Sequence, residues 1–346
     1  MLRKKVNITK KVYIAKTLSD YIKIIGSITK CIKSIDKRYE IWFRGQEDCN
    51  YSLTPSGLRN IKEKTRCQYM RKGEDVEIVE LNKLLQNFKR KSINNLESIP
   101  SSEIEWLIIA QHYGLSTQLL DWTTNALIGL YFSLPDKYSM YRINYDDLMS
   151  IAEQYDLSLD DIKNKGQYEL CKLKYCNSYN EDEIDEDNLT YSGIMKSGAV
   201  VYAMSPNILN SKTVGVNMPI YVGDKDVQKD MEIFMNVNTE NYNRILKSIS
   251  SKAISDTPLC INCNEIDKRI RNQSGCFTLH GYYCAPLDFY GMFNDDIYTI
   301  YIPYDSVEKI RRELKECGID KYFVYQDLNS LAEELNREEL DIFNDK

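Results

Sequence analysis

The chain has 346 residues, of which 43% are hydrophobic and 28% are charged, and its formal net charge at pH 7 is -6. These values are typical of a globular protein with a large core, and the negative charge argues against non-specific attraction to nucleic acid or anionic lipid. The longest apolar stretches, at 105–110 and 126–134, are too short to cross a membrane, and ten cysteines are spread along a chain without an apolar leader segment. We therefore expect a cytoplasmic protein with reduced thiols and no membrane partner.

The N-terminal part of the chain predicts a helix, a strand, a loop and a second helix. Between Leu18 and Ile32, apolar residues recur at helical spacing, which indicates one buried helix face. The short stretch YEIWF is rich in strand-forming residues, and we expect this strand to end where Arg44 and Gly45 begin. The four predicted elements are a helix at 18–32, a strand at 39–43, a loop at 54–60 and a helix at 74–91.

Two apolar helices joined by a polar connector are predicted next. Ser102 and Glu105 have the spacing of a capping box, and Gly114 is a favourable left-handed residue at a helix end. The predicted elements here are a helix that begins at Ser102 and ends at Gly114, a connector at 115–124 and a helix at 125–134.

The second half of the chain predicts an insertion followed by further strands and helices. Residues 136–195 combine short amphipathic helices with an acidic run, and we expect a solvated insertion on the surface of the main fold. After it, strands are predicted at 198–206, 276–283 and 297–304, and helices at 306–318 and 327–343. No repeat or linker divides residues 1–346, so the sequence predicts one α+β domain. Its mixed or antiparallel central sheet is flanked by helices, and residues 286–346 supply a C-terminal strand and helices.

Several polar residues stand in apolar surroundings. The two histidines, His112 and His280, each lie near a glycine and aromatic residues. A neutral imidazole there can donate or accept a hydrogen bond near neutral pH, or it can be a satisfied core residue. The stretch 121–125 lies between a helix end and a helix start. Asp121 or Thr123 caps the following helix, or the hydroxyls and the helix N-terminus surround an anionic ligand.

Three further groups have both an ordinary and a functional interpretation. The stretch with Arg271 and Gln273 is an exposed basic turn, or it places an amide against a ribose or base. The CxxC at 260–263 is followed by cysteines with the wrong spacing for a zinc knuckle, so we expect no metal. Basic residues gather at 59–72 and 88–91, where they form a charged helix face or a surface for a phosphodiester chain.

Five stretches of the sequence carry a resemblance to a known family. They are WFRGQ, YSLTPSGLR, QHYGLSTQLLDWTTNALIGLYF, GAVVY and RIRNQSGCFTLHG, which follow one another within residues 39–285. In these stretches the chain resembles the FRG domain family, named for its Phe/Tyr-Arg-Gly motif. It departs from the family at Ser116, Thr117 and Gln118, where Pro-Thr-Arg is typical, and at Ala126, where proline is typical.

The resemblance suggests, by analogy, a fold like that of the ADP-ribosyltransferases, with NAD as the cofactor. In those folds an arginine or histidine at the end of the first core strand holds NAD, and a late acidic or amide residue contacts the nicotinamide ribose. The analogy implies catalytic roles for Arg44, His112, Asp121 and Gln273. It implies NAD contacts at Phe43, Arg44, Gly45, Gln111, Tyr113, Trp122, Thr123 and Thr124, and substrate contacts at Arg271 and His280. Gly45 would let the backbone turn closely around the ligand.

Three functions are compatible with these residues. The first is NAD-dependent ADP-ribosyl transfer or NAD glycohydrolysis, as a toxin or effector of bacterial defence, with a protein or nucleic acid as acceptor. The second is a non-catalytic module that senses a nucleotide or nucleic acid through Arg44 and the basic residues. The third is a nuclease that uses His112, Asp121 and His280. The sequence leaves the oligomeric state open.

Overall fold

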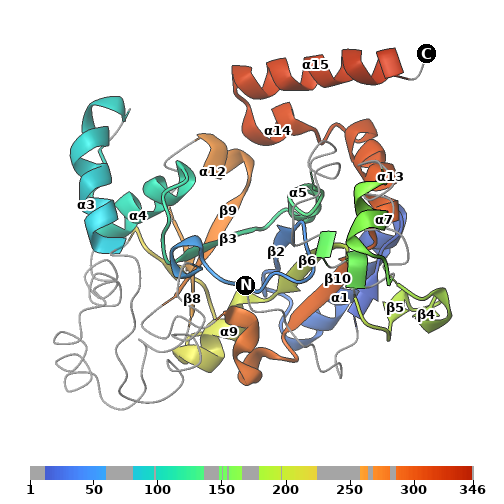
Figure 1. Ribbon diagram of the computed structural model, residues 1–346. Coiled ribbons are helices and arrows are strands. Elements are labelled where there is room, and N and C mark those ends of the chain that lie inside the picture. Colours follow the sequence, from blue (N-terminus) through green and yellow to red (C-terminus); the bar gives the residue numbers. More distant parts are fainter. Residues whose placement is uncertain are drawn as a thin grey trace.

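The computed structural model describes residues 12–59, 81–96, 99–135, 148–149, 151–153, 156–165, 179–195, 197–223, 258–263, 268–280 and 286–344. In these residues one mixed sheet carries helices packed against it (Figure 1). The predicted α+β class is therefore confirmed.

A sheet of ten strands organises the described residues, in the order β4-β5-β1-β10-β6-β2-β3-β9-β8-β7. Its strands are β1 (Val12–Ile14), β2 (Trp42–Gln46), β3 (Leu119–Thr123), β4 (Ile184–Asp185), β5 (Thr190–Tyr191), β6 (Ala199–Met204), β7 (Ile220–Tyr221), β8 (Leu259–Asn262), β9 (Gly275–Leu279) and β10 (Ile297–Ile302). β1 runs parallel to β10 and β7 parallel to β8, whereas the other neighbouring strands are antiparallel. Because β10 lies between β1 and β6, the C-terminal part of the chain supplies a central strand.

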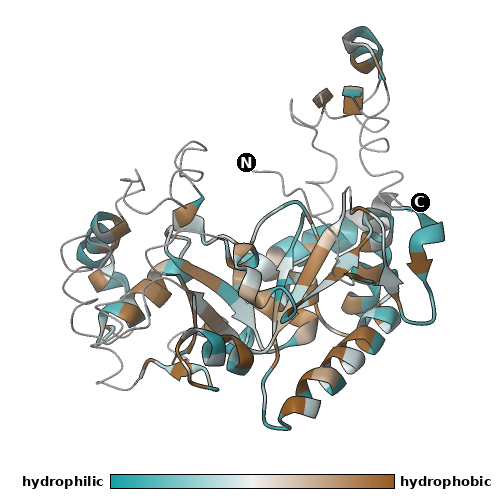
Figure 2. Cartoon of the chain, turned by 90° about the horizontal axis from the view of Figure 1, so that it is seen from below, coloured by the Kyte–Doolittle hydropathy of each residue, from teal (hydrophilic) through white to brown (hydrophobic). Residues whose placement is uncertain are grey.

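Helices cover the sheet toward both of its ends. α1 (Leu18–Ile35) and α13 (Tyr304–Glu316) contact each other toward one end, and α3 (Leu81–Ser92) and α4 (Glu103–His112) contact each other toward the other (Figure 1). The other described α-helices are α5 (Ala126–Tyr131), α7 (Leu159–Lys163), α9 (Pro206–Thr213), α12 (Lys268–Asn272), α14 (Lys321–Tyr325) and α15 (Leu328–Asn344). Figure 2 shows hydrophobic and hydrophilic residues alternating along the helices, as amphipathic helices require.

Both faces of the central strands are buried. β6 shows this most plainly, since all six of its residues are buried. On one face, Trp42, Trp122 and Tyr202 belong to one core cluster. On the other face, Phe43 and Val201 pack with residues of α1, α5 and α13, and a third cluster packs α4 on β8 and β9.

The ends of α1 and α4 show how the local sequence positions these helices. Thr17 and Ser102 are the N-caps, and each accepts a hydrogen bond from a first-turn amide through its side chain. α4 is followed by Gly114, whose φ of 83° is left-handed, as predicted. The reciprocal bond of the predicted capping box is not formed, because the Glu105 carboxylate accepts hydrogen bonds from the backbone and side chain of Ser101 instead.

The strand predicted at 39–43 extends further than expected. β2 begins at Trp42 and continues through Gln46, so Arg44 and Gly45 lie inside the strand. They remain in it because β2 pairs with β6 along its whole length. The prediction that the strand ends at Arg44 is therefore wrong.

The connector predicted at 115–124 contains a strand. β3 pairs with β9 over its full length, and this long-range pairing overrides the turn-like composition of the stretch. The N-cap of α5 is Asn125, whose Oδ1 accepts a hydrogen bond from the Leu127 amide at 2.9 Å. Asp121 and Thr123 therefore belong to a strand and do not cap the helix.

The insertion predicted at 136–195 is more than a surface decoration. Its described residues include α7, and its acidic run contains β4, which pairs with β5. β5 pairs in turn with β1, so this hairpin extends the central sheet at one edge. Lys16 also contacts Glu181 of the acidic run at 3.3 Å. The acidic residues of this run are exposed, as expected for a solvated segment, but residues 184–191 also extend the central sheet, which was not expected.

The other predicted elements are largely present in the described residues. β6, β9 and β10 match the three late strands, and α1, α5, α13 and α15 match predicted helices. The predicted loop at 54–60 contains a short 3-10 helix, η1 (Ser56–Leu58). Residues 60–80 lie outside the described residues, and with them the start of the helix predicted at 74–91 and most of the basic group at 59–72. β1, β7, β8, α9, α12 and α14 were not predicted.

Candidate functional site

Strands β2 and β3 diverge after a single pair of residues. Phe43 pairs with Thr123, and no further pair joins the two strands, while β2 continues along β6 and β3 along β9. At this divergence the Arg44 side chain reaches β3, where Nη1 donates a hydrogen bond to the Asp121 carbonyl at 2.6 Å. If the antiparallel pairing continued, Gly45 would lie opposite Asp121, but these two residues do not pair. The Arg44 guanidinium group therefore donates to the Asp121 carbonyl in place of a backbone amide.

A cavity of about 320 Å³ lies beside this divergence. Its volume is at the lower end of the range of known ligand pockets. The lining residues are Phe43, Arg44, Gly45, Gln111, His112, Asp121, Trp122, Thr123, Phe132, Ile270, Gln273, Gly275, Phe277 and Tyr325. Aromatic rings and polar side chains therefore line a common space, which suits a flat ring joined to a polar group.

The Asp121 carboxylate is accessible and is held by two partners. The Asp121 side chain is 55% exposed. Its Oδ2 accepts a hydrogen bond from Gln111 Nε2 at 2.9 Å and lies 3.8 Å from Arg44 Nη1. The carboxylate is thus oriented from two sides but remains open to a ligand.

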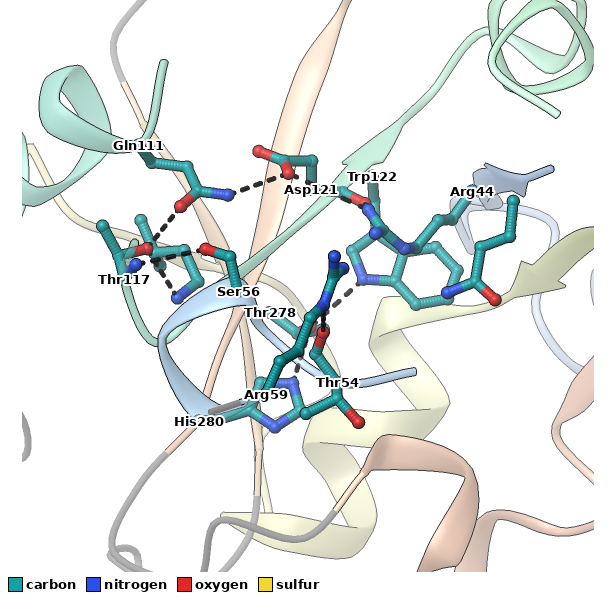
Figure 3. Close-up of polar contacts among 12 residues, drawn as sticks. Arg44, Thr54, Ser56, Arg59, Gln111, Thr117, Asp121, Trp122, Thr278 and His280 are labelled. Atoms are coloured by element: carbon teal, nitrogen blue, oxygen red, sulfur yellow. Dashed lines mark hydrogen bonds and ion pairs between the residues drawn. The ribbon is translucent and has the colours of Figure 1, made fainter. Parts of the chain in front are cut away.

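A chain of hydrogen bonds fixes the amide group of Gln111 (Figure 3). Thr117 Oγ1 donates to Gln111 Oε1 at 2.5 Å, so the other end of this amide, Nε2, is the donor to Asp121. The Thr117 amide donates in turn to Ser56 Oγ at 3.2 Å. These hydrogen bonds connect η1, α4 and β3, and together they fix the position of the Asp121 carboxylate.

Burial disfavours the charge of Arg44. Its side chain is 13% exposed, and desolvation lowers the pKa of the guanidinium group to about 10. The Asp121 carboxylate raises this pKa and offsets part of the burial, whereas the positive charge of Arg59 lowers it further. The Nε atom of Arg44 is buried without a hydrogen-bond partner. At neutral pH Arg44 is therefore a charged but incompletely compensated cation.

The turn between α12 and β9 brings Gln273 to the pocket. Thr123 Oγ1 donates to the Gln273 carbonyl at 2.6 Å, and the Thr124 amide donates to the Ser274 carbonyl at 3.1 Å. Ser274 has a φ of 48°, a left-handed conformation within this turn. The stretch read as a basic turn is thus a short helix followed by a turn that is bonded to β3, with Arg271 exposed on the helix.

The structure brings together most of the residues assigned to a site from the sequence. The lining contains all four residues with predicted catalytic roles: Arg44, His112, Asp121 and Gln273. It also contains the predicted NAD contacts Phe43, Gly45, Gln111, Trp122 and Thr123. Tyr113, Thr124 and Arg271 are exposed and lie outside this lining.

His280 lies in the core and is not part of the pocket lining. It has no exposed surface. Its Nε2 is 3.3 Å from Thr278 Oγ1, which accepts a hydrogen bond from Trp122 Nε1 at 3.1 Å (Figure 3). The ordinary interpretation of His280 as a core residue therefore fits, and His280 does not join His112 and Asp121 as the nuclease hypothesis requires.

Five lining residues were not predicted: Phe132, Ile270, Gly275, Phe277 and Tyr325. Phe132 and Tyr325 contact edge to face, with their ring centroids 6.3 Å apart. The first four lie within the stretches that carry the family resemblance, where their apolar or small side chains indicated only a core. Tyr325 belongs to α14, beyond residues 39–285, and no local pattern marks it.

Gly45 serves packing between β2 and α5. A Cβ atom at this position would lie 2.3 Å from the Gly129 carbonyl oxygen and from the Ser133 amide nitrogen. The close approach that excludes a side chain here is therefore that of the α5 backbone. The glycine therefore has a packing reason at this position, and its role in the approach of a ligand stays a prediction.

The remaining sequence motifs belong to the core or to the surface. Cys260 of the CxxC lies in β8 without exposed surface, and burial raises the pKa of its thiol well above the ordinary value. In the part of the chain that the structure describes, no group of three or more His, Cys, Asp and Glu residues could hold a metal ion. Nor does any helix in that part combine the length and apolar character needed to span a bilayer.

Comparison with known proteins gives a family match for part of the chain. Residues 39–141 match the FRG domain. No curated protein and no solved structure matches the chain. The matched segment contains β2, α4 and β3, which supply Arg44, Gln111 and Asp121 to the pocket. At residues 39–141 this chain therefore carries an FRG domain.

Proposed function

We propose that this protein binds NAD with the nicotinamide-ribose end in the pocket and breaks the bond between nicotinamide and ribose. The ADP-ribosyl group then passes to water or to an acceptor. The observation that carries the proposal is the position of Asp121, whose half-exposed carboxylate is oriented by Gln111 in a cavity with aromatic walls. The analogy with ADP-ribosyltransferases points to the same residues, but an analogy at the level of the fold carries less weight than the pocket.

The cleavage of this glycosidic bond needs few catalytic groups. When the bond between ribose C1′ and the pyridinium N1 breaks, both electrons go to the nitrogen, so nicotinamide leaves as a neutral base. Positive charge develops at C1′ and the ring oxygen, and a nearby carboxylate stabilises it. Asp121 supplies that carboxylate. Water or an acceptor then attacks C1′ and gives up a proton, and His112 in the pocket lining is the group proposed to accept it.

The walls of the pocket suit the two parts of this ligand. Phe132, Phe277 and Tyr325 offer aromatic surface to the nicotinamide ring, and the Gln273 amide can bond to a ribose hydroxyl. With a cavity of about 320 Å³, the proposal puts the nicotinamide-ribose end inside and the phosphate groups at the margin.

Incubation of the purified protein with NAD tests the proposal. We expect the wild-type protein to release nicotinamide, measured by chromatography, and Asp121→Asn to lower the rate at least about 100-fold while the protein stays folded, as circular dichroism checks. Asp160→Asn is the matched control, because this carboxylate on α7 is 88% exposed and is no part of the pocket lining. The absence of both NAD binding and nicotinamide release, with protein and nucleic acid offered as acceptors, would refute the proposal.

A second candidate is a module that binds a nucleotide without catalysis. Gln273 favours it, because the late position of the pocket lining is a glutamine, and a side-chain amide can orient a ribose but cannot act as a base. NAD binding by the wild-type protein without nicotinamide release would support this candidate over cleavage.

A further inference from the structure

Two arginines from different elements approach each other beside the pocket. Arg44 lies in β2, and Arg59 directly follows η1 at the end of the stretch YSLTPSGLR. The cleavage proposed above gives Arg59 no role. Figure 3 shows the Arg59 side chain extending toward the contact between Arg44 and Asp121. The charge of Arg59 is also close enough to lower the pKa of Arg44.

Both guanidinium groups keep donors that the described residues do not use. Arg44 donates to Asp121 through Nη1, and its Nη2 makes no hydrogen bond. Arg59 donates from Nε to the Thr54 carbonyl at 3.0 Å and from neither terminal nitrogen. Among the described residues no carboxylate lies at ion-pair distance from Arg59. Three terminal nitrogens on two cations are therefore open to an anion.

We propose that Arg44 and Arg59 form a phosphate subsite, which takes the phosphate groups of the nucleotide whose other end enters the pocket. This inference rests on the proposed function. A guanidinium group presents two parallel donors that match two phosphate oxygens. An anion between the two arginines also relieves their mutual repulsion and compensates the buried charge of Arg44. The bond from Arg59 to Thr54 holds the guanidinium group in place before the ligand arrives, which gives YSLTPSGLR a binding role.

Calorimetric titration of the full chain with three probes tests the subsite. The probes are ADP-ribose, inorganic pyrophosphate and nicotinamide riboside, which has no phosphate. Arg59→Gln should weaken the binding of ADP-ribose and pyrophosphate at least about tenfold, the loss expected for one charged hydrogen-bonding group. Nicotinamide riboside should bind this variant as it binds the wild type. Arg59→Lys keeps the charge but loses the paired donors, and its loss should be intermediate.

Arg312→Gln is the matched control for these titrations. Arg312 is an exposed arginine of α13 outside the pocket lining, so this variant should bind all three probes normally. The subsite is refuted if Arg59→Gln binds ADP-ribose and pyrophosphate as the wild type does. The subsite is also refuted if Arg59→Gln, at an unchanged Tm, loses affinity for nicotinamide riboside as much as it does for ADP-ribose and pyrophosphate. If Arg59→Gln does not fold, Arg59→Lys decides by the same comparison.

The outcomes separate this inference from the proposed function. Pyrophosphate binding that depends on Arg59, without nicotinamide release from NAD, would leave the subsite standing and refute cleavage. Nicotinamide release together with phosphate binding that is independent of Arg59 would refute the subsite and leave cleavage standing.

Discussion

Replacing Gly45 with alanine tests why β2 carries a glycine beside the pocket. An added Cβ would lie 2.3 Å from the Gly129 carbonyl oxygen and from the Ser133 amide nitrogen, and 2.6 Å from the Phe132 carbonyl carbon. All three are backbone atoms, so no rotation of a side chain can relieve the contact. The same closeness holds in the other direction, because a Cβ on Gly129 would lie 2.7 Å from the Cβ of Phe43.

The size of the effect follows from this contact. Ordinary contacts of a Cβ atom begin at 3.4 Å, so β2 and α5 must separate by about 1 Å to admit the methyl group. Overpacking costs about 1–3 kcal/mol, and we expect the upper end because backbone has to move. At about 2.1 cal/mol/K per residue, the unfolding entropy of 346 residues is about 0.7 kcal/mol/K. A loss of about 3 kcal/mol therefore lowers Tm by about 4 °C.

Thermal unfolding followed by circular dichroism measures this change. Gly26→Ala is the matched control, because a Cβ at Gly26 meets no atom within 4 Å and the residue lies inside α1. Alanine in a helix interior is about 0.5–1 kcal/mol more stable than glycine, so this control should raise Tm slightly. A wild-type Tm for Gly45→Ala would refute the account of β2 and α5 packing, as would an equal loss in Gly26→Ala.

Three further experiments test other parts of the site. Thr117→Val removes the hydroxyl that orients Gln111, so nicotinamide release should fall about tenfold and the free energy of unfolding by about 1–3 kcal/mol; an unchanged rate would show that the amide needs no such partner. Tyr325→Ala removes an aromatic wall of the pocket and should weaken the binding of nicotinamide riboside about three- to tenfold in a titration. An affinity equal to that of the wild type would contradict the role of Tyr325. Cys31 is exposed, whereas burial raises the pKa of Cys49 to about 12, so a thiol reagent should modify Cys31 rapidly and Cys49 only after unfolding; equal rates would contradict the burial.

The elements that the sequence predicted well have a clear apolar pattern. α1 has one apolar helical face, and β6 is a continuous buried run, so periodicity or hydrophobicity marks both of them. The sequence predicts a connector in place of β3, because Asp121 and Thr123 are polar where the strand faces the pocket and give it the composition of a turn. β1 and β8 have only three and four residues, too few for a clear pattern, and β1 exists through pairing with β10, far away in the sequence.

The candidate site could be predicted where polar residues stood among apolar ones. That rule singled out His112 and Asp121, which the structure brings to one cavity, and also His280, which lies in the core. The contact between Arg44 and Asp121 could not be predicted from the sequence, because it depends on β2 and β3 being neighbours that diverge after one pair of residues. The place of Tyr325 in the pocket lining could not be predicted either, because only the tertiary fold brings α14 to the pocket.

A crystal structure with nicotinamide riboside bound is the most direct test of the central claim, that the pocket holds the nicotinamide-ribose end of NAD against Asp121. We predict the nicotinamide ring beside Phe277 and Tyr325, and the ribose C1′ within about 3–3.5 Å of an Asp121 carboxylate oxygen. A ligand bound elsewhere, or bound in the pocket with C1′ turned away from Asp121, would contradict the account.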